Sequence, residues 1–366
     1  MKKYMIKNQK EKKNKYIINL FTKTLVLLII LLIYILLCKY TNLKKKKKKI
    51  GIISVRHEVN IGNNLVKYAI SQKLKEFGLI PYIIGTHWRD YNITFINETT
   101  NLVIIKNNFS EIKEQEYDIL LVNSDQTWFR FDKNFYDYGF LKFAENWNTP
   151  RFSYGASFGD LFTSKKEDQT IIKRLLKKFI GLSVREKSAV KILQKNFGIN
   201  SIQVLDPTLL LDKNNYLELI KNYKSNISVN ENYIFSYLIS PSNYTLKIIN
   251  ESALKLNYKV HFFLLNNDTS IQNFLYQISH CKAVITNSFH GTIFSIIFNK
   301  PFITIRDIKT PRFASLGEIF EIKSRIINNY DITKLHLLNE PLKINKTLFN
   351  YLKEKSLNFL KNISKY

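Results

Sequence analysis

The sequence predicts an α/β protein with two doubly wound, Rossmann-like domains that face a cleft, preceded by a single transmembrane helix. Three observations support this fold class. Short, continuously apolar runs alternate with segments of helical period, which is typical of parallel strands covered by helices on both faces. A polar segment at residues 221–232 interrupts the pattern once, and the pattern then resumes. An apolar run at residues 17–38 precedes the whole alternating pattern.

The apolar run at residues 17–38 is predicted to be a membrane anchor. Its 22 residues, at about 1.5 Å of helical rise each, cover the roughly 30 Å hydrocarbon core of a bilayer. Because no small-residue cleavage site follows, we expect a retained single-pass anchor rather than a cleaved signal peptide. A basic tail (residues 1–16) precedes it and a Lys-rich linker (residues 39–49) follows it, so the positive-inside rule gives no orientation.

Glycosylation sequons give a second indication of location. They occur downstream of the anchor at Asn92, Asn97, Asn108 and Asn243. We therefore expect a type II membrane protein of the secretory pathway, with its larger part in the lumen.

The formal net charge of +27 is uneven along the chain. The first 49 residues carry 15 Lys and one acidic residue, Glu11, so about half of the excess lies before the predicted domains. Since no RNA-binding signature or zinc-finger spacing accompanies this charge, we expect membrane flanking and anionic substrates rather than nucleic acid. The two cysteines, Cys38 and Cys281, have no metal-type spacing, and we expect no metal.

The first predicted domain covers residues 50–225. A helix is expected within residues 60–79, where apolar residues repeat at helical spacing from Leu65 to Phe77 until Gly78 ends the helix, and another at residues 169–180. Short strands are expected to end near Arg185 and Asp206. The other expected strands are residues 50–55, 81–86, 102–105, 119–123 and 152–156.

The second predicted domain covers residues 226–366 and repeats this pattern. Strands are expected at residues 233–238, 260–265, 283–286 and 302–305. Helices are expected at residues 244–256, 271–279, 291–298, 313–320 and 346–360. Ligands of such sheets bind beyond the carboxyl ends of the strands, so the polar residues there are the candidate site.

Four polar residues at strand ends are candidates for chemistry, and each has a structural alternative. Asp125 follows an apolar strand and could cap a loop or accept a proton. Arg185 could pair with Glu186 or bind a carboxylate or phosphate with its forked guanidinium. Pro207 prevents Asp206 from continuing into a helix, and Asp206 could be a cap or a catalytic group. His290 lies between a strand and a helix N-terminus, where it could be structural or contact a ligand.

The loop after the first strand is a further candidate. Its sequence "SVRHEVNIGNN" contains Gly62 and Asn64, and a glycine-containing turn can present backbone N–H groups to an anion or merely connect a strand to a helix. Arg56 and His57 lie at the strand end and could face the cleft.

Seven segments in order resemble the polysaccharide pyruvyl transferase family: "NIGNNLVKYAI", "VNSDQTWF", "FSYGASFGD", "SVREKSAVKIL", "VLDPTLLL", "VITNSFHGTIFSIIFNKPFI" and "PRFASLGEIF". The resemblance covers residues 49–327. It implies a GT-B-like fold and transfer of the pyruvyl group of phosphoenolpyruvate to sugar hydroxyls, forming a pyruvate ketal. Arg185 and His290 fall on the family's basic motifs. Ser288 stands where many members have Arg, and Asn63 and Asn64 stand where others have Gly-Asp or small residues.

The expected mechanism follows from the donor's two anionic groups. We expect Arg185 to bind one of them, with Ser288 and the N–H groups of Gly291 and Thr292 supporting the other. His290 suits proton transfer near neutral pH, and either Asp125 or Asp206 could activate the sugar hydroxyl. Phosphoenolpyruvate is the donor substrate, a glycan is the acceptor, and no cofactor is expected.

Two other functions remain open from the sequence. One is a GT-B glycosyltransferase with a nucleotide-sugar donor. The other is a non-catalytic, membrane-tethered glycan-binding protein built on the same fold.

Overall fold

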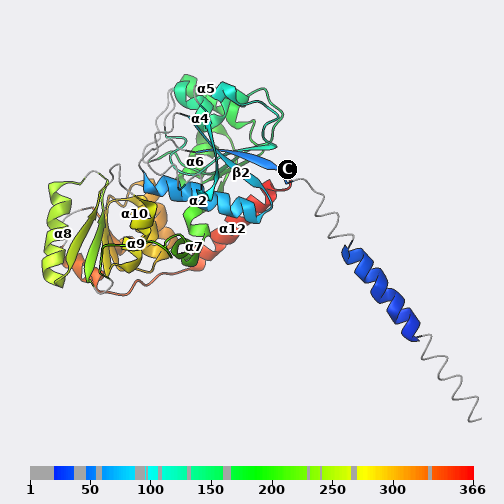
Figure 1. Ribbon diagram of the computed structural model, residues 1–366. Coiled ribbons are helices and arrows are strands. Elements are labelled where there is room, and N and C mark those ends of the chain that lie inside the picture. Colours follow the sequence, from blue (N-terminus) through cyan, green and yellow to red (C-terminus); the bar gives the residue numbers. More distant parts are fainter. Residues whose placement is uncertain are drawn as a thin grey trace, which may run out of the picture. The chain divides into compact units, whose positions relative to one another are not determined.

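The computed structural model describes residues 20–36, 47–54, 60–86, 95, 98–105, 109–129, 133–159, 166–228, 231–239, 241–264, 270–328 and 332–366. The chain divides into two compact units, residues 1–47 and 48–366 (Figure 1). In the first unit, residues 20–36 form a helix whose apolar side chains are exposed. No helix within the described residues has the length and apolar character needed to cross a bilayer. The predicted anchor, residues 17–38, extends past the described residues at both ends, and the tail 1–16 lies outside them.

The second unit begins with a seven-stranded parallel sheet in the order β3-β2-β1-β4-β5-β6-β7. The chain switches direction across the sheet at the β1–β4 neighbours, which is where doubly wound sheets bind ligands. Its strands are β1 (Lys49–Ile53), β2 (Ile80–Thr86), β3 (Asn101–Ile105), β4 (Ile119–Val122), β5 (Arg151–Ala156), β6 (Gly181–Val184) and β7 (Ile202–Gln203). The helical segments are α2 (Ile61–Glu76), η1 (Phe109–Glu111), α4 (Lys133–Phe140), η2 (Lys142–Ala144), α5 (Lys166–Leu176), α6 (Lys187–Ile192), η3 (Leu193–Phe197), η4 (Pro207–Leu210) and α7 (Lys213–Glu218).

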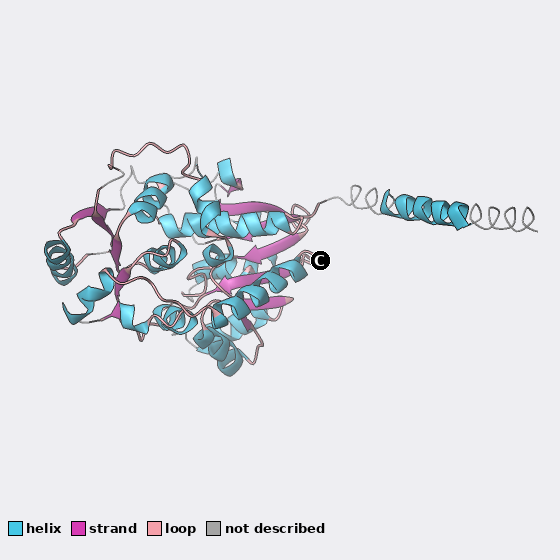
Figure 2. Cartoon of the chain, turned by 90° about the horizontal axis from the view of Figure 1, so that it is seen from below, coloured by secondary structure: helices cyan, strands magenta, loops and turns pink. Residues whose placement is uncertain are grey.

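A second parallel sheet follows, with five strands in the order β12-β11-β10-β8-β9. Helices flank the strands of both sheets (Figure 2). The strands are β8 (Tyr233–Tyr237), β9 (Lys259–Phe263), β10 (Ala283–Thr286), β11 (Phe302–Ile305) and β12 (Ile326–Ile327). The helical segments are α8 (Asn243–Leu256), α9 (Ile271–His280), α10 (Phe289–Ile297), α11 (Pro311–Ile319), η5 (Lys323–Arg325), η6 (Ile332–Leu338) and α12 (Thr347–Ile363).

The predicted fold class is confirmed for these two parallel-sheet α/β domains. β10 and β11 have the predicted bounds, because three apolar residues and one threonine, all buried, fill the whole of each strand. α10 begins two residues earlier than predicted, since Ser288 caps it. The helices α4 and α7 and the strand β12 were not predicted. Each helix has fewer than three turns and the strand has two residues, and segments this short give too little periodicity to be detected.

The last helix, α12, differs from the prediction in its partner. We expected residues 226–366 to form the second domain, but α12 packs on the first sheet, beside which the chain ends (Figure 1). The Ser356 hydroxyl accepts a hydrogen bond from the Leu205 N–H at 2.9 Å, and the Phe359 ring lies 6.4 Å from the Phe152 ring. An apolar helix face does not specify which sheet it will cover, so periodicity alone could not reveal this.

Helix α2 connects the two halves of the second unit. It contacts η4 of the first half and α9 of the second. Its residues from Ile61 to Ser71 are buried, including the polar side chains of Asn63, Asn64 and Lys67. The N-terminus of α2 is therefore enclosed where the two halves meet.

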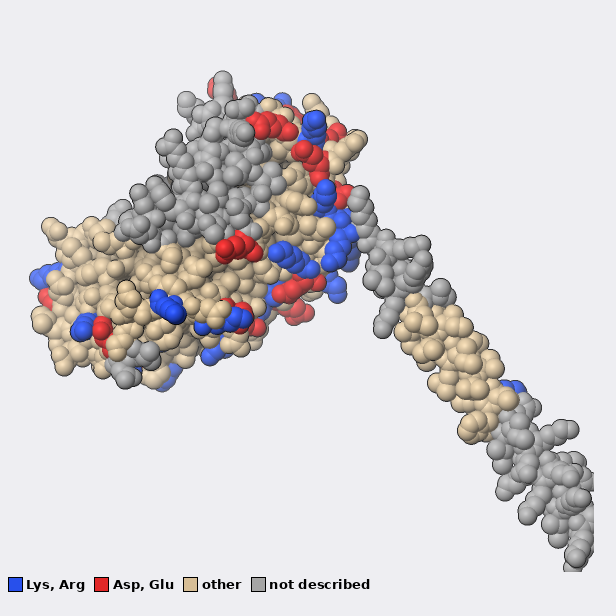
Figure 3. Space-filling view, viewed as in Figure 1, with Lys and Arg blue, Asp and Glu red and all other residues tan. Residues whose placement is uncertain are grey.

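Charged side chains of both signs are interspersed on the face seen in Figure 3. The described part of this face shows no broad surface of a single sign.

Candidate active site

The candidate site is a buried group of charged residues around Arg185, which directly follows β6. The Arg185 Nε donates to Glu186 Oε1 at 2.8 Å, and its Nη1 donates to Asp206 Oδ2 at 2.9 Å. Its Nη2 makes a longer contact of 3.4 Å with Asp125 Oδ1. Together with His290, these four residues are called the Arg185 cluster. β4, β6 and β7 thus deliver their following residues to one place, as parallel strands do at their carboxyl ends.

Neighbouring charges shift the pKa values of Arg185, Asp206 and Asp125 within the cluster. Burial alone would lower the pKa of Arg185, but Glu186, Asp125 and Asp206 raise it above its ordinary value. Burial would likewise raise the pKa of Asp206, but His290, Arg185 and a hydroxyl hold it below its ordinary value. The pKa of Asp125 is also lowered, since Arg185 and His290 outweigh the effect of burial. Three carboxylates therefore surround one guanidinium, and a further positive charge is favoured there.

His290 brings the second sheet into this cluster. It lies in the first turn of α10, with only 5% of its surface exposed. Its Nε2 lies 3.7 Å from Asp206 Oδ2, beyond hydrogen-bond distance, and has no hydrogen-bond partner among the described residues. The neighbouring Phe289 ring lies 4.4 Å from the Arg185 guanidinium carbon, within range of a cation–π contact. The carboxyl edges of the two sheets therefore meet at His290 and Arg185.

Ser288, Gly291 and Thr292 build the start of α10. The Ser288 Oγ accepts from the Gly291 N–H at 3.3 Å, and the Ser288 carbonyl accepts from the Thr292 N–H at 3.1 Å. A Cβ on Gly291 would lie only 2.3 Å from Thr286 Oγ1, so this turn requires glycine. The two N–H groups predicted to support an anion are thus bonded to Ser288 in this structure, and they position His290.

The two candidate aspartates differ in what holds them. Asp206 caps η4, because its Oδ1 accepts from the Thr208 N–H at 3.0 Å and from Thr208 Oγ1 at 2.7 Å. Both of its oxygens are therefore engaged, and its structural alternative as a cap is confirmed. Asp125 has a backbone φ of 92°, in the left-handed region, and its side chain is 12% exposed against 1% for Asp206. Such backbone strain is concentrated at functional sites, and Asp125 is the more accessible carboxylate.

Gly62, predicted as part of a loop, lies in the first turn of α2 and contributes directly to the site. A Cβ on Gly62 would lie 2.0 Å from His290 Nδ1, so the imidazole occupies the space that only glycine leaves open. The Asn64 side chain is buried, and its Oδ1 accepts from Lys67 Nζ at 3.1 Å. Arg56 and His57 lie outside the described residues.

Sequence reasoning missed Arg312, which lies in α11. In the amide orientation that satisfies both side chains, the Gln126 oxygen accepts from Arg312 Nη2 at 2.9 Å and from Nη1 at 3.0 Å. Its guanidinium lies 5.9 Å from the Phe289 ring, and its charge contributes to the lowered pKa of Asp125. The only sequence signal was its place in the segment "PRFASLGEIF", because helical periodicity gives no distance to a residue almost two hundred positions earlier.

Solved structures share this fold. UDP-GlcNAc 2-epimerase from Methanocaldococcus jannaschii superimposes with a TM-score of 0.56 at 15% identity, over 87% of this chain and 100% of that chain. The UDP-GlcNAc 2-epimerase from Neisseria meningitidis, bound to UDP-GlcNAc, gives a TM-score of 0.54 at 14% identity, over 87% of this chain and 97% of that chain. At these identities the similarity shows the two-domain GT-B-like fold alone.

Sequence comparison identifies the family. No curated protein matches the chain significantly. The profile of the polysaccharide pyruvyl transferases matches residues 60–307, a span that contains all five residues of the Arg185 cluster. The chain therefore belongs to the polysaccharide pyruvyl transferase family.

Proposed function

We propose that the protein transfers the pyruvyl group of phosphoenolpyruvate to two hydroxyls of a sugar in a glycan or polysaccharide. Membership of a transferase family supports this reaction class. The observation that carries the proposal is the meeting of His290, a proton-transfer group, with Asp125 and Arg185 at the carboxyl edges of both sheets.

The proposed reaction balances without a metal or redox cofactor. A proton adds to the methylene carbon of phosphoenolpyruvate, and the first sugar hydroxyl adds to the adjacent carbon and loses its proton. The bond from that carbon to the phosphate oxygen breaks, and the second hydroxyl closes the ketal and loses its proton. Of the two hydroxyl protons, one replaces the proton spent on the methyl group and the other leaves on inorganic phosphate.

In this proposal, His290 donates the proton to the methylene carbon from its Nε2, which has no hydrogen-bond partner among the described residues. Asp125 accepts the hydroxyl proton. It is preferred over Asp206 because Asp206 has both oxygens engaged, whereas Asp125 has a single long contact, to Arg185, within the part of the chain that the structure describes. Asp206 then positions Arg185 and His290.

The donor's anionic groups need positive charge that the three carboxylates do not already neutralise. We propose that the donor carboxylate takes the place of Asp125 on Arg185 Nη2, the weakest of the three contacts, which also frees Asp125 as the base. Arg312 and protonated His290 supply the charge for the phosphate. Ser288, Gly291 and Thr292 hold His290 in position, and Gly62 lies against its imidazole. The buried Asn64 lies near Gly62 at the start of α2.

The proposal includes the location predicted from the sequence. The apolar run at residues 17–38 anchors the protein as a type II, single-pass membrane protein, with the transferase unit in the secretory-pathway lumen. Sensitivity of the expressed full chain to a glycosidase tests this orientation, and a unit that protease digests in sealed vesicles without detergent contradicts it.

The donor assay tests the function. The full chain is incubated with phosphoenolpyruvate and galactose- or mannose-containing acceptors, and phosphate release is measured beside the ketal methyl signal in the NMR spectrum. We expect His290→Ala and Asp125→Asn to lower turnover by about 10²- to 10⁴-fold, as loss of acid–base catalysis does. His336→Ala, which removes an exposed histidine of η6, serves as the matched control and keeps full turnover.

Two results contradict the proposal. Consumption of a nucleotide sugar with no turnover of phosphoenolpyruvate would show a glycosyltransferase instead. Glycan binding without any turnover, unchanged by His290→Ala, would show a non-catalytic glycan-binding protein.

A further inference from the structure

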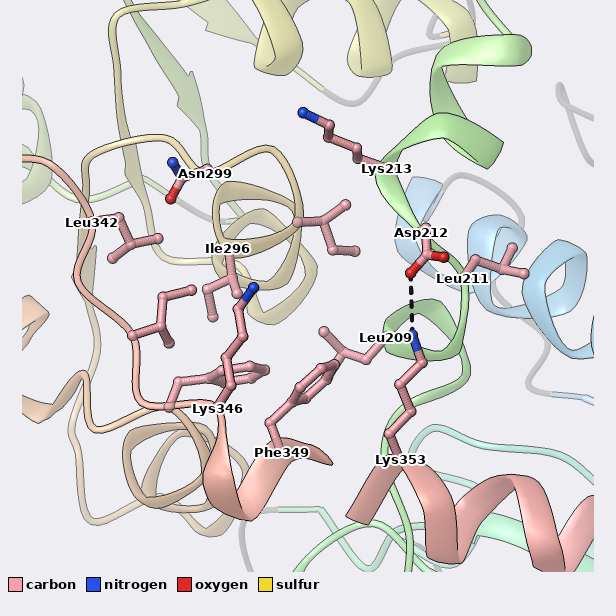
Figure 4. Close-up of a pocket in the computed structure, with 13 residues that line it drawn as sticks. Leu209, Leu211, Asp212, Lys213, Ile296, Asn299, Leu342, Lys346, Phe349 and Lys353 are labelled. Carbon is pink, nitrogen blue, oxygen red and sulfur yellow. Dashed lines mark hydrogen bonds and ion pairs between the residues drawn. The ribbon is translucent and has the colours of Figure 1, made fainter. Parts of the chain in front are cut away.

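A pocket outside the Arg185 cluster lies beside η4 and the C-terminal end of α10. It has a volume of about 520 Å³, within the range of about 300–1,000 Å³ that is common for small-molecule sites. Leu209 of η4, Ile296 of α10 and Phe349 of α12 contribute to its wall, so both halves of the unit form it (Figure 4). Nothing in the reaction proposed above uses this pocket.

The wall of this pocket is mainly apolar. Leu209, Leu342 and Phe320 are buried, and Ile297 and Phe349 are partly exposed to the open space. A polar or fully hydrated ligand would leave these side chains against water or unpaired groups. An aliphatic chain instead removes about 25 cal/mol of unfavourable hydration for each Å² of apolar surface that it covers.

The rim of the same pocket is basic. Lys213, Lys346 and Lys353 lie on it with one acidic residue, Asp212, so the lysines are in excess by two charges. Lys353 Nζ contacts Asp212 Oδ1 at 3.1 Å, as the dashed line in Figure 4 shows. The amine of Lys346 extends into the space between α12 and α10 in the same view. An ammonium group beside apolar walls favours an anionic group attached to an apolar body.

The position of the pocket separates it from the candidate active site. Asp206 and His290 lie at the N-terminal ends of η4 and α10, whereas Ile296 and Ile297 lie at the C-terminal end of α10. Nine helical residues place the two ends of α10 roughly 12 Å apart, at about 1.5 Å of rise for each residue. A molecule in this pocket therefore does not occupy the site of the reaction.

We propose that this pocket binds a single amphipathic anion, namely an aliphatic chain that carries a phosphate head. The chain lies against Leu209, Ile296 and Phe349, and the phosphate lies between Lys346 and Lys213. Since the pocket is formed by η4, α10 and α12 together, its occupant holds the two halves of the unit in one arrangement. The proposal concerns binding and does not depend on the donor or the acceptor of the transfer reaction.

Calorimetric titration of the full chain in a neutral detergent tests this proposal with decyl phosphate below its micellar concentration. Decyl maltoside has the same chain without the charge, and inorganic phosphate has the charge without the chain. We expect decyl phosphate to bind at least about tenfold more tightly than either. Lys346→Glu should weaken that binding by about tenfold, the effect of losing one hydrogen bond to a charged group. Lys361→Glu, an exposed lysine of α12 outside the pocket, is the matched control and should have no effect.

A second variant tests the apolar wall. Ile297→Trp places a bulky indole ring at a partly exposed position and should block the pocket without disturbing the buried core. Binding of decyl phosphate should therefore be lost, while the unfolding temperature is unchanged. Equal affinity for decyl phosphate and decyl maltoside would overturn the proposal, as would equal binding by Lys346→Glu and Lys361→Glu. If Lys346→Glu weakens binding to phosphatidylglycerol vesicles but not to decyl phosphate, the lysines form a membrane-facing surface and the pocket assignment is wrong.

Discussion

The replacement Gly62→Ala tests how closely α2 and His290 approach each other. The added Cβ would lie 2.0 Å from His290 Nδ1, 2.3 Å from its Cγ and 2.8 Å from its Cβ. Ordinary van der Waals contact begins near 3.4 Å, so the imidazole has to withdraw by about 1.4 Å. A displacement of about 1 Å at a reacting group can cost on the order of 100-fold in rate, and we expect a loss of that size in turnover.

The effect of Gly62→Ala on stability is small by comparison. Alanine in place of glycine within a helix stabilises by about 1 kcal/mol, whereas overpacking costs about 1–3 kcal/mol. The net loss should be about 1 kcal/mol, which urea unfolding measures alongside the phosphate-release assay. Gly317→Ala in α11 is the control, because a Cβ there would have as its nearest neighbour a Lys323 side-chain carbon, 3.0 Å away, that can move.

A double-mutant cycle with His290→Ala makes the test independent of the reaction. Removing the imidazole relieves the two shortest contacts but keeps the 2.8 Å contact with Cβ, so Gly62→Ala should destabilise the His290→Ala background less than the wild type. If Gly62→Ala keeps both wild-type turnover and wild-type stability, the imidazole does not lie against α2. If the stability coupling appears without any loss of turnover, His290 is a packing residue and not the proton donor.

Three further predictions concern the charges and the packing. Arg185→Met leaves three buried carboxylates without their common partner and should lower the free energy of unfolding by about 3–5 kcal/mol. The control Arg174→Met, at an exposed ion pair, should lower it by less than about 1 kcal/mol. Equal losses for the two variants in urea unfolding would contradict the cluster. The pKa of Asp206 is lowered in the folded state, so its ionised carboxylate stabilises the fold above the ordinary carboxyl pKa of about 4, and this effect is lost as the pH falls through the folded-state pKa. Asp206→Asn should therefore flatten the acid side of the curve of stability against pH. An unchanged slope would refute the ion-pair assignment. Ser356→Ala leaves the buried Leu205 N–H, which follows β7, without its acceptor and should lower the free energy of unfolding by about 1–3 kcal/mol. The control Ser364→Ala, whose hydroxyl bond is exposed, should lower it little. Equal losses for the two variants would mean that α12 does not dock on the first sheet.

The candidate site shows the limits of sequence patterns in particular residues. Asp125, Arg185, Asp206 and His290 could be named as candidates because each follows an apolar strand, and parallel strands bring their carboxyl ends to one edge. Their pairing could not be predicted, since no periodicity relates positions that lie 60 residues apart along the chain. The strand-end rule also omits Arg312, whose charge acts on Asp125 from a helix of the second half.

The sequence by itself determined the α/β class, most of the strands and the family, because runs of four or five apolar residues and ordered motifs are local properties of the chain. Only the tertiary structure decided which residues meet. It placed α12 on the first sheet and directed three carboxylates to one guanidinium. It also set the imidazole of His290 in the space left by Gly62. These contacts depend on how two sheets and the helices between them pack, and close packing fixes distances that no spacing along a chain contains.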